Sequence, residues 1–341
     1  MSKLSLKIRI PLIALIVLIS LILTALVGAI AYFRLPVSSY YSASDKAFVI
    51  PGLDSDFVPQ GMHYDRENRT ILVSGYSADG NASSIYLVDS ESYETKKRIE
   101  LTEADGEDYT GHAGGVAQFS DYVYVAGSGE RCLYVFPYDE MLDAENGARV
   151  APIGSFSLKA SGDDYVKSSF VSVCDGKLIT GEFYREENYK TLDSHKLTTE
   201  GGDYNCALAL EFSLDEKYEF GIAPTPERAY SLPERVQGLH LDGATMYLSR
   251  SYGLAFSDII EYDLKDAYDE GTVTVLGTKL PLLSLDLTNY KSLYKIPPMS
   301  EEITMIDGKM LVMCESASGK YMFGKLTGGK WCYATDLSLL K

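Results

Sequence analysis

The sequence predicts an all-β fold built from repeats, and three observations support this prediction. Residues 60–65 (QGMHYD) return almost unchanged as residues 237–242 (QGLHLD), and each copy leads into a β-rich run. Looser copies begin at Gly114, Phe170 and Glu302, each with an apolar strand, a turn containing Asp and a second apolar strand. The copies recur at intervals of about 50 to 70 residues, which is typical of stacked or radial repeats.

Ahead of the repeats, the N-terminus predicts a transmembrane helix. Residues 1–9 contain three basic side chains and no acidic one, and residues 10–33 form an uncharged run of 24 residues. A helix of this length spans a hydrocarbon layer of roughly 30 Å at about 1.5 Å per residue. Because the positive charges precede the span, we expect residues 1–9 in the cytoplasm and the rest of the chain outside.

A cleaved signal peptide is the alternative for this segment. Ala29 and Ala31 have the small-x-small spacing of a cleavage site. The apolar run is longer than the about 7 to 15 residues of a signal sequence, which favours an uncleaved signal-anchor.

We interpret residues 34–44 as a linker and residues 45–341 as one extracytoplasmic domain. The whole chain has a net charge of −17, and residues 1–34 carry four basic and no acidic side chains, so the remainder carries −21. An acidic surface repels nucleic acid and anionic lipid and favours cationic partners. We therefore expect a small polar or cationic ligand or a cell-envelope protein as partner, no nucleic acid, and membrane contact through the N-terminal helix only.

Period-2 apolar patterns bounded by Gly, Asp and Asn predict the strands of the repeats. In chain order the predicted strands are 60–64, 71–75, 85–89 and 95–101; 114–118, 122–127, 132–137 and 153–158; 170–174, 177–182, 206–212 and 228–232; 237–241, 245–250, 258–263 and 292–296; and 302–306, 309–314 and 331–337. The last repeat has three strands, and the four others have four.

The strand missing from the last repeat is available at the other end of the chain. Residues 47–50 are apolar and precede the first repeat. Pairing them beside 331–337 closes a ring and removes an exposed sheet edge. The sequence thus predicts a five-bladed β-propeller. A six-bladed propeller, in which a hairpin at 272–285 forms part of an extra blade, is the alternative.

In a propeller, the loop that enters each inner strand and the loop between the second and third strands lie on the same face. The entering loops are acidic, and two of the other loops, 183–205 and 315–330, are long enough to be binding loops. Polar side chains gather at this tunnel mouth, where they can hydrogen-bond a small ligand or hold a cation. The predicted ligand-binding residues are Gln60, His112, Glu182, His195, Gln237, Arg250, Tyr252, Glu302 and Glu315.

Two details qualify this site. His63 and His240 lie within strands on the side opposite Gln60, so we expect them to pack between blades, and no HxH or HExxH spacing indicates zinc. Arg250 is a cation in an acidic mouth, so we expect it either to pair with Glu302 or Glu315 or to bind an anionic group of the ligand.

Several stretches resemble known propellers: VPQGM at Val58, DYTGHAGGVA at Asp108, GEFYRE at Gly181, RVQGL at Arg235 and PPMSEE at Pro297. They look like those of a group of membrane-anchored propeller proteins of Gram-positive bacteria. More distantly, the chain is similar to the SMP-30/gluconolactonase and paraoxonase-like calcium propellers and to the propeller class of glutaminyl cyclases.

The distant resemblance implies a central Ca²⁺ ion held by acidic and amide side chains of the inner strands. The matching positions here are Gln60, Gly114, Phe170, Gln237 and Glu302, with one carboxylate only. We therefore expect a membrane-anchored propeller that binds a small polar ligand or a cell-envelope partner at its tunnel face. A hydrolase or lyase of lactonase or esterase type, with or without calcium, or a glutaminyl-cyclase-like enzyme is the alternative.

Overall fold

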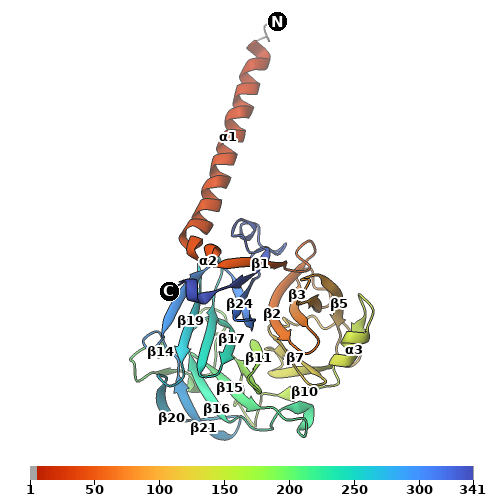
Figure 1. The fold of residues 1–341 in the computed structure, drawn as a ribbon, viewed down its shortest axis with the longest axis vertical. Helices are drawn as coiled ribbons and strands as arrows, with labels where there is room; N and C mark the ends of the chain where they lie inside the picture. The colour runs from red at the N-terminus through yellow and green to blue at the C-terminus, as the bar shows by residue number, and fades with distance from the viewer. Residues whose placement is uncertain (1–5, 341) are drawn as a thin grey trace.

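Each sequence repeat forms one antiparallel sheet, and five such sheets surround a central axis (Figure 1). The structure is a computed structural model, and it describes residues 6–340. The blades, each from the inner to the outer strand, are β2 (Phe57–Asp65), β3 (Thr70–Ser77), β4 (Ser84–Asp89) and β5 (Thr95–Leu101); β6 (Val116–Phe119), β7 (Tyr122–Gly127), β8 (Cys132–Pro137) and β10 (Gly154–Ser157); β11 (Phe170–Cys174), β12 (Lys177–Gly181), β15 (Ala207–Ser213) and β16 (Arg228–Leu232); β17 (Val236–Asp242), β18 (Thr245–Arg250), β19 (Ser257–Asp263) and β22 (Ser292–Ile296); and β23 (Ser300–Ile306), β24 (Lys309–Cys314), β25 (Trp331–Thr335) and β1 (Ser44–Val49). The predicted five-bladed β-propeller is confirmed.

The strand β1 closes the ring as predicted. It pairs antiparallel with β25, with Lys46 opposite Tyr333 and Val49 opposite Trp331. Phe48 is buried in the apolar cluster between the fifth and first blades. The N-terminal strand therefore covers the edge that the last blade would otherwise expose.

The six-bladed alternative is wrong, because the hairpin formed by β20 (Tyr268–Val275) and β21 (Thr278–Ser284) joins the third blade. β21 pairs parallel with β16, with Ala229 opposite Leu282, so the sheet has six strands. An extra blade needs an inner strand at the axis, whereas this hairpin lies on an outer edge.

Apolar clusters between neighbouring blades form the core. Near the axis the inner strands approach so closely that only glycine fits at some positions. A Cβ on Gly115 would lie 2.4 Å from the Val171 nitrogen, and one on Gly61 would lie 2.5 Å from the Val116 nitrogen. These backbone contacts set the width of the central tunnel.

At the N-terminus, α1 (Leu6–Arg34) projects away from the propeller (Figure 1). The helical stretch Ile10–Ser42 is long and apolar enough to cross a membrane, and its most apolar part is not buried against the propeller. Residues 1–5 of the expected cytoplasmic segment lie outside the described residues.

The segment expected to be a linker is folded onto the propeller. It forms η1 (Leu35–Val37) and α2 (Ser38–Ser42). Val37 and Tyr40 are fully buried in a cluster with residues of the fourth and fifth blades. The base of α1 is therefore attached to the propeller by packing as well as by the chain.

Shorter elements fill the connections. They are α3 (Tyr138–Asp143), β9 (Arg149–Val150), η2 (Asp193–His195), β13 (Leu197–Thr198), β14 (Tyr204–Asn205), η3 (Glu219–Gly221), η4 (Gly324–Leu326) and η5 (Leu337–Leu340). Both long loops of the predicted binding face thus contain ordered structure. The five cysteines are free and buried.

Candidate functional site

A cavity of about 590 Å³ lies at the mouth of the tunnel, and all five blades contribute residues to it. Five of the predicted ligand-binding residues line this cavity: Gln60, His112, Gln237, Tyr252 and Glu315. Four others, Glu182, His195, Arg250 and Glu302, are not among its lining residues.

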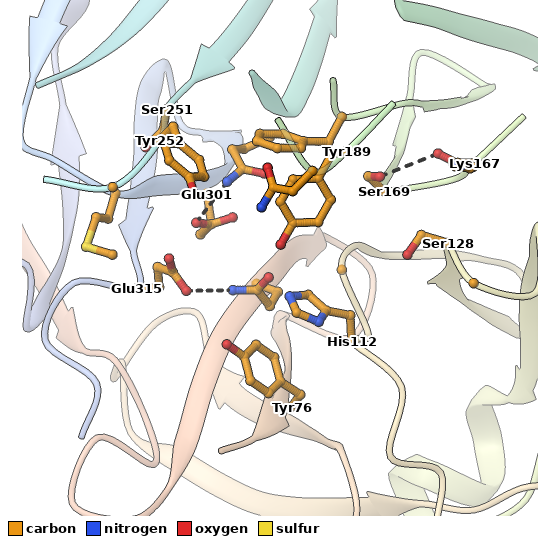
Figure 2. Close-up of a pocket in the computed structure, with 18 of the residues that line it drawn as sticks. Tyr76, His112, Ser128, Lys167, Ser169, Tyr189, Ser251, Tyr252, Glu301 and Glu315 are labelled. Atoms are coloured by element: carbon orange, nitrogen blue, oxygen red, sulfur yellow. Dashed lines mark hydrogen bonds between the residues drawn. The ribbon is translucent and has the colours of Figure 1, made fainter. Parts of the chain in front are cut away.

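A pair of acidic side chains from the fifth blade dominates one side of the cavity. Glu301 comes from β23 and Glu315 follows β24, and both point into the same space (Figure 2). Gln60 Nε2 donates a hydrogen bond of 3.0 Å to Glu315 Oε2, and Gln237 Nε2 donates one of 3.3 Å to Glu301 Oε1. Tyr321 donates its hydroxyl hydrogen to Glu315 Oε1 at 2.9 Å. The acidic pair is thus held by two amides and a phenol.

Burial raises the pKa of both acids. The pKa of Glu315 rises to about 7 because the carboxyl is removed from water. Burial raises the pKa of Glu301 well above its ordinary value, and the neighbouring charges of Glu315 and Glu302 raise it further. The pair therefore carries less than two negative charges at neutral pH.

Irregular pairing of the inner strands turns three of these side chains toward the axis. The register shifts between Pro59 and Gly61 in β2, between Val236 and Gly238 in β17, and between Ser300 and Ile303 in β23. At each shift the inner strand has one residue more than its partner, and an extra residue of this kind is re-aimed relative to the regular strand. The residues within these shifts are Gln60, Gln237 and, in β23, Glu301 and Glu302, of which Glu301 lines the cavity.

Aromatic side chains form the rest of the wall. Phe183 packs edge-on against Tyr189 at 5.2 Å and lies 6.4 Å from the ring of Tyr252. The guanidinium carbon of Arg185 lies 4.1 Å from the centre of the Tyr252 ring. Figure 2 shows Tyr189 and Tyr252 beside the acidic pair. These aromatic faces can accept a cationic group of a ligand.

A smaller aromatic stack lies next to Glu315. The rings of Tyr76 and His112 stack at 4.3 Å, and Lys320 donates a hydrogen bond to the Tyr76 hydroxyl. Burial lowers the pKa of His112, and the charge of Lys320 lowers it further. His112 is therefore a neutral hydrogen-bonding group at physiological pH.

Glu182 and His195 hold the long loop of the third blade in place. His195 Nδ1 and Glu182 Oε2 lie 2.8 Å apart, and both side chains are fully or almost fully buried. The other Glu182 oxygen accepts a hydrogen bond of 3.3 Å from the Lys167 backbone N–H. This pair connects η2 to the end of β12 and so supports the loop that carries Tyr189.

The predicted pairing of Arg250 with Glu302 or Glu315 is wrong. Arg250 Nη2 lies 2.8 Å from Asp258 Oδ2, because the two residues are opposite each other on β18 and β19. Glu302 lies between the fourth and fifth blades, where its Oε1 accepts a hydrogen bond of 3.0 Å from the Leu239 N–H. Burial raises the pKa of Glu302 well above its ordinary value.

His63 and His240 are mostly buried away from the cavity, as expected. His240 Nδ1 lies 3.5 Å from the sulfur of Cys174. Burial lowers the pKa of His63 and of His240 to about 4. Both imidazoles are therefore neutral packing groups in the folded protein.

The sequence prediction missed Glu301, Lys320 and Tyr321. Lys320 and Tyr321 lie in the loop 315–330, whose length pointed to this region without selecting residues. Glu301 belongs to one of the acidic entering loops in the sequence prediction, and the register shift that aims it inward leaves no local pattern in the sequence.

No group of three or more His, Cys, Asp or Glu side chains in residues 6–340 has metal-binding geometry. Ca²⁺ takes six to eight oxygen ligands. Glu301 and Glu315 offer two carboxylates to such an ion, and binding of calcium stays a prediction.

These features define a five-bladed β-propeller with a cavity of ligand size at its axis. Aromatic rings, the acids Glu301 and Glu315 and the bases Arg131, Lys167 and Lys320 line this cavity. No protein-family model and no curated protein matches the chain. The resemblance to propellers of Gram-positive bacteria therefore stays a prediction.

Solved structures are similar to this chain at low sequence identity. The PQQ-bound aldose sugar dehydrogenase of Streptomyces coelicolor shares 14% identity over 85% of this chain and 95% of that one, with a TM-score of 0.46. The GH43_1 enzyme of Xanthomonas citri, complexed with xylose, shares 11% over 88% and 92%, with a TM-score of 0.43. The glutaminyl cyclase of Myxococcus xanthus shares 13% over 82% and 89%, with a TM-score of 0.40. Sequence identities and TM-scores this low show nothing about the activity of this chain.

Proposed function

We propose that this chain is a membrane-anchored propeller that binds a small polar ligand with a cationic group in the cavity beside Glu301 and Glu315. The observation that carries the proposal is the burial of two acidic side chains against aromatic rings in one cavity. Ionising both carboxyl groups in a buried cavity costs free energy, because the two negative charges repel each other and are removed from water. An ammonium group of a ligand would offset that cost. The cavity volume of about 590 Å³ suits a molecule of small-metabolite size.

The pKa of Glu315 predicts how binding depends on pH. Burial raises this pKa to about 7, so Glu315 loses its proton as the pH rises through neutrality. A cationic ligand binds the ionised form better, and its affinity should therefore increase across this range. Binding near pH 7 should also release protons, which calorimetry in buffers of different ionisation enthalpy measures.

The test is a thermal-shift screen of small amines, amino acids and quaternary ammonium compounds, followed by calorimetry on hits. Glu301→Gln keeps the volume and removes a carboxyl that a bound cation would ionise, and it should weaken binding by tenfold or more, about 1.4 kcal/mol. Glu94→Gln, at an exposed position just before β5, is the control and should bind normally. Equal affinity of the Glu301→Gln variant and the wild type would show that the ligand does not use this pair.

An enzyme is the second candidate, and the pKa of Glu315 favours it. Burial raises this pKa to about 7, which suits a carboxyl that gives and takes a proton at neutral pH. Lactones, esters and peptides with N-terminal glutamine are the substrates to assay. Turnover that disappears in Glu315→Gln would support the enzyme, whereas ligand binding without turnover supports the receptor. Dependence on calcium stays a prediction, which metal analysis of the purified protein tests.

We further propose that α1 is an uncleaved, single-pass anchor with its N-terminus in the cytoplasm and the propeller outside. The basic residues ahead of the uncharged run 10–33 support this orientation. External protease on intact cells should release the propeller and leave a small stub. Full protection would contradict the orientation, and a mature N-terminus just after Ala31 would show a cleaved signal peptide.

A further inference from the structure

One stretch of the acidic domain is basic and apolar. No acidic residue lies between Glu315 and Asp336, whereas Lys320, Lys325 and Lys330 do. Within this stretch Met322 and Phe323 are 78% and 61% exposed. Neighbouring exposed side chains of this size are unfavourable in water, and a cationic surround would attract an anionic surface.

This stretch is attached to the base of α1. Arg34 Nε donates a hydrogen bond of 3.3 Å to the Leu326 carbonyl oxygen in η4, and the Tyr41 hydroxyl donates one to the Thr327 carbonyl oxygen. Figure 1 shows the loop after β24 rising beside the lower end of the helix. Its height relative to α1 is therefore set by direct contacts.

A second part of the helix base has a similar character. The ring of Tyr32 lies 6.3 Å from that of Phe256, and Lys295 Nζ lies 4.0 Å from the centre of the Phe256 ring. Aromatic and basic side chains together are typical of the level at which a transmembrane helix leaves the hydrocarbon. The uncharged run ends at Phe33, so the structure places the loop at this same level.

We propose that residues 319–330, which we term the interface loop, form a second membrane contact beside α1. Met322 and Phe323 enter the headgroup region, and Lys325 and Lys330 contact anionic lipids. This inference rests on the proposed anchor and extends it, since the sequence alone placed the membrane contact in the helix only. The free energy of contact between the interface loop and the lipids is small. Because α1 holds the loop next to the membrane, a weak contact is sufficient.

The contact has a consequence for the cavity. Lys320 and Tyr321 belong to the interface loop and also line the cavity, where Tyr321 holds Glu315 at 2.9 Å. A loop fixed by lipid would keep this wall in place. Loss of the lipid contact therefore loosens the hydrogen bond to Glu315.

The test uses the full chain in lipid nanodiscs with a polarity-sensitive label on single introduced cysteines. The five native cysteines are buried, and burial raises the pKa of Cys132 and Cys206 to about 11, so they label poorly. Phe323→Cys reports on the interface loop. Ile153→Cys, at a 53% exposed apolar residue of the second blade, is the matched control, and Leu21→Cys reports on α1.

With brominated lipid, labels at positions 21 and 323 should be quenched and the label at 153 should not. In discs containing phosphatidylglycerol, Lys325→Gln and Lys330→Gln should each weaken the loop–lipid equilibrium about fivefold. If the label at position 21 is quenched and the label at position 323 is quenched no more than the one at position 153, the proposed membrane contact of the interface loop is wrong, while the anchor stands. No quenching at 21 would overturn the anchor itself. An unchanged melting curve for each variant shows that the fold is intact.

Discussion

The acidic pair of the cavity makes a prediction about stability that can be worked out from the structure. Burial raises the pKa of Glu315 from 4.5 to about 7, so between these values the folded chain keeps a proton that the unfolded chain releases. The contribution of Glu315 to stability is therefore greatest below about pH 4.5 and declines as the pH rises to about 7. Above that value Glu315 is ionised in both states and its contribution is constant.

Glu315→Gln removes this dependence because an amide does not titrate in the range. Between about pH 5 and about pH 8, the free energy of unfolding of the wild type should fall by about 2 to 3 kcal/mol relative to that of the variant. The variant also loses the hydrogen bonds from Gln60 and Tyr321 to the Glu315 carboxylate. This loss changes its free energy of unfolding by the same amount at both pH values, so it cancels from the difference. Contributions of the histidines cancel as well, since both proteins contain them.

Urea unfolding followed by far-UV circular dichroism measures this difference, and urea adds no salt that would screen charges. Glu94→Gln removes an exposed carboxyl and should leave the difference unchanged. If the stability curves of Glu315→Gln and the wild type run parallel from about pH 5 to about pH 8, then the buried-acid argument is refuted. The proposed pH dependence of ligand binding would be refuted with it.

Further predictions concern the fold. Phe48→Ala should destabilise the protein by about 3 to 5 kcal/mol, because Phe48 is 3% exposed and holds the closing strand; an unchanged urea midpoint would contradict this. Gly115→Ala should lower the melting temperature sharply, because its Cβ would lie 2.4 Å from a backbone nitrogen, whereas Gly129→Ala, with nothing within 4 Å, should not. Burial lowers the pKa of His63 and His240 to about 4, so between about pH 4 and about pH 6.5 these two side chains bind fewer protons in the folded than in the unfolded state. Their contribution to stability should therefore rise with pH across that window. Replacing either histidine with Gln should flatten this rise in urea unfolding.

Strand positions could be predicted because the patterns that determine them are local. β7 (Tyr122–Gly127) and β18 (Thr245–Arg250) begin and end at the predicted residues, since apolar alternation and an adjoining Asp or Gly turn mark both ends. The hairpin of β20 and β21 was also visible in the sequence. Which sheet it joins was not, because the choice of edge depends on how Leu280 and Leu282 pack against the third blade.

The acidic residue of the cavity shows how a small local difference moves a site. In β17 the last strand residue before the turn is Asp242, whereas in the fifth blade Asp307 belongs to the turn itself and β23 ends at Ile306. Aligning the repeats on these aspartates selects Glu302 instead of Glu301. Alternate residues of a strand face opposite sides of the sheet. A shift of one residue in the alignment therefore selects Glu302, which is buried between blades, instead of Glu301, which lines the cavity.

Periodicity, repeat length and charge thus determined the all-β class, the blade count, the closing strand and the apolar N-terminal helix, because each of these follows from the order of residues along the chain. The tertiary structure alone decided that Glu301 and Glu315 meet, that Arg250 pairs with Asp258 and that the loop of Phe323 lies at the base of α1. These pairs bring together residues from different strands, loops or blades. Their contacts depend on bulges, register and the approach of inner strands, which no single stretch of sequence specifies.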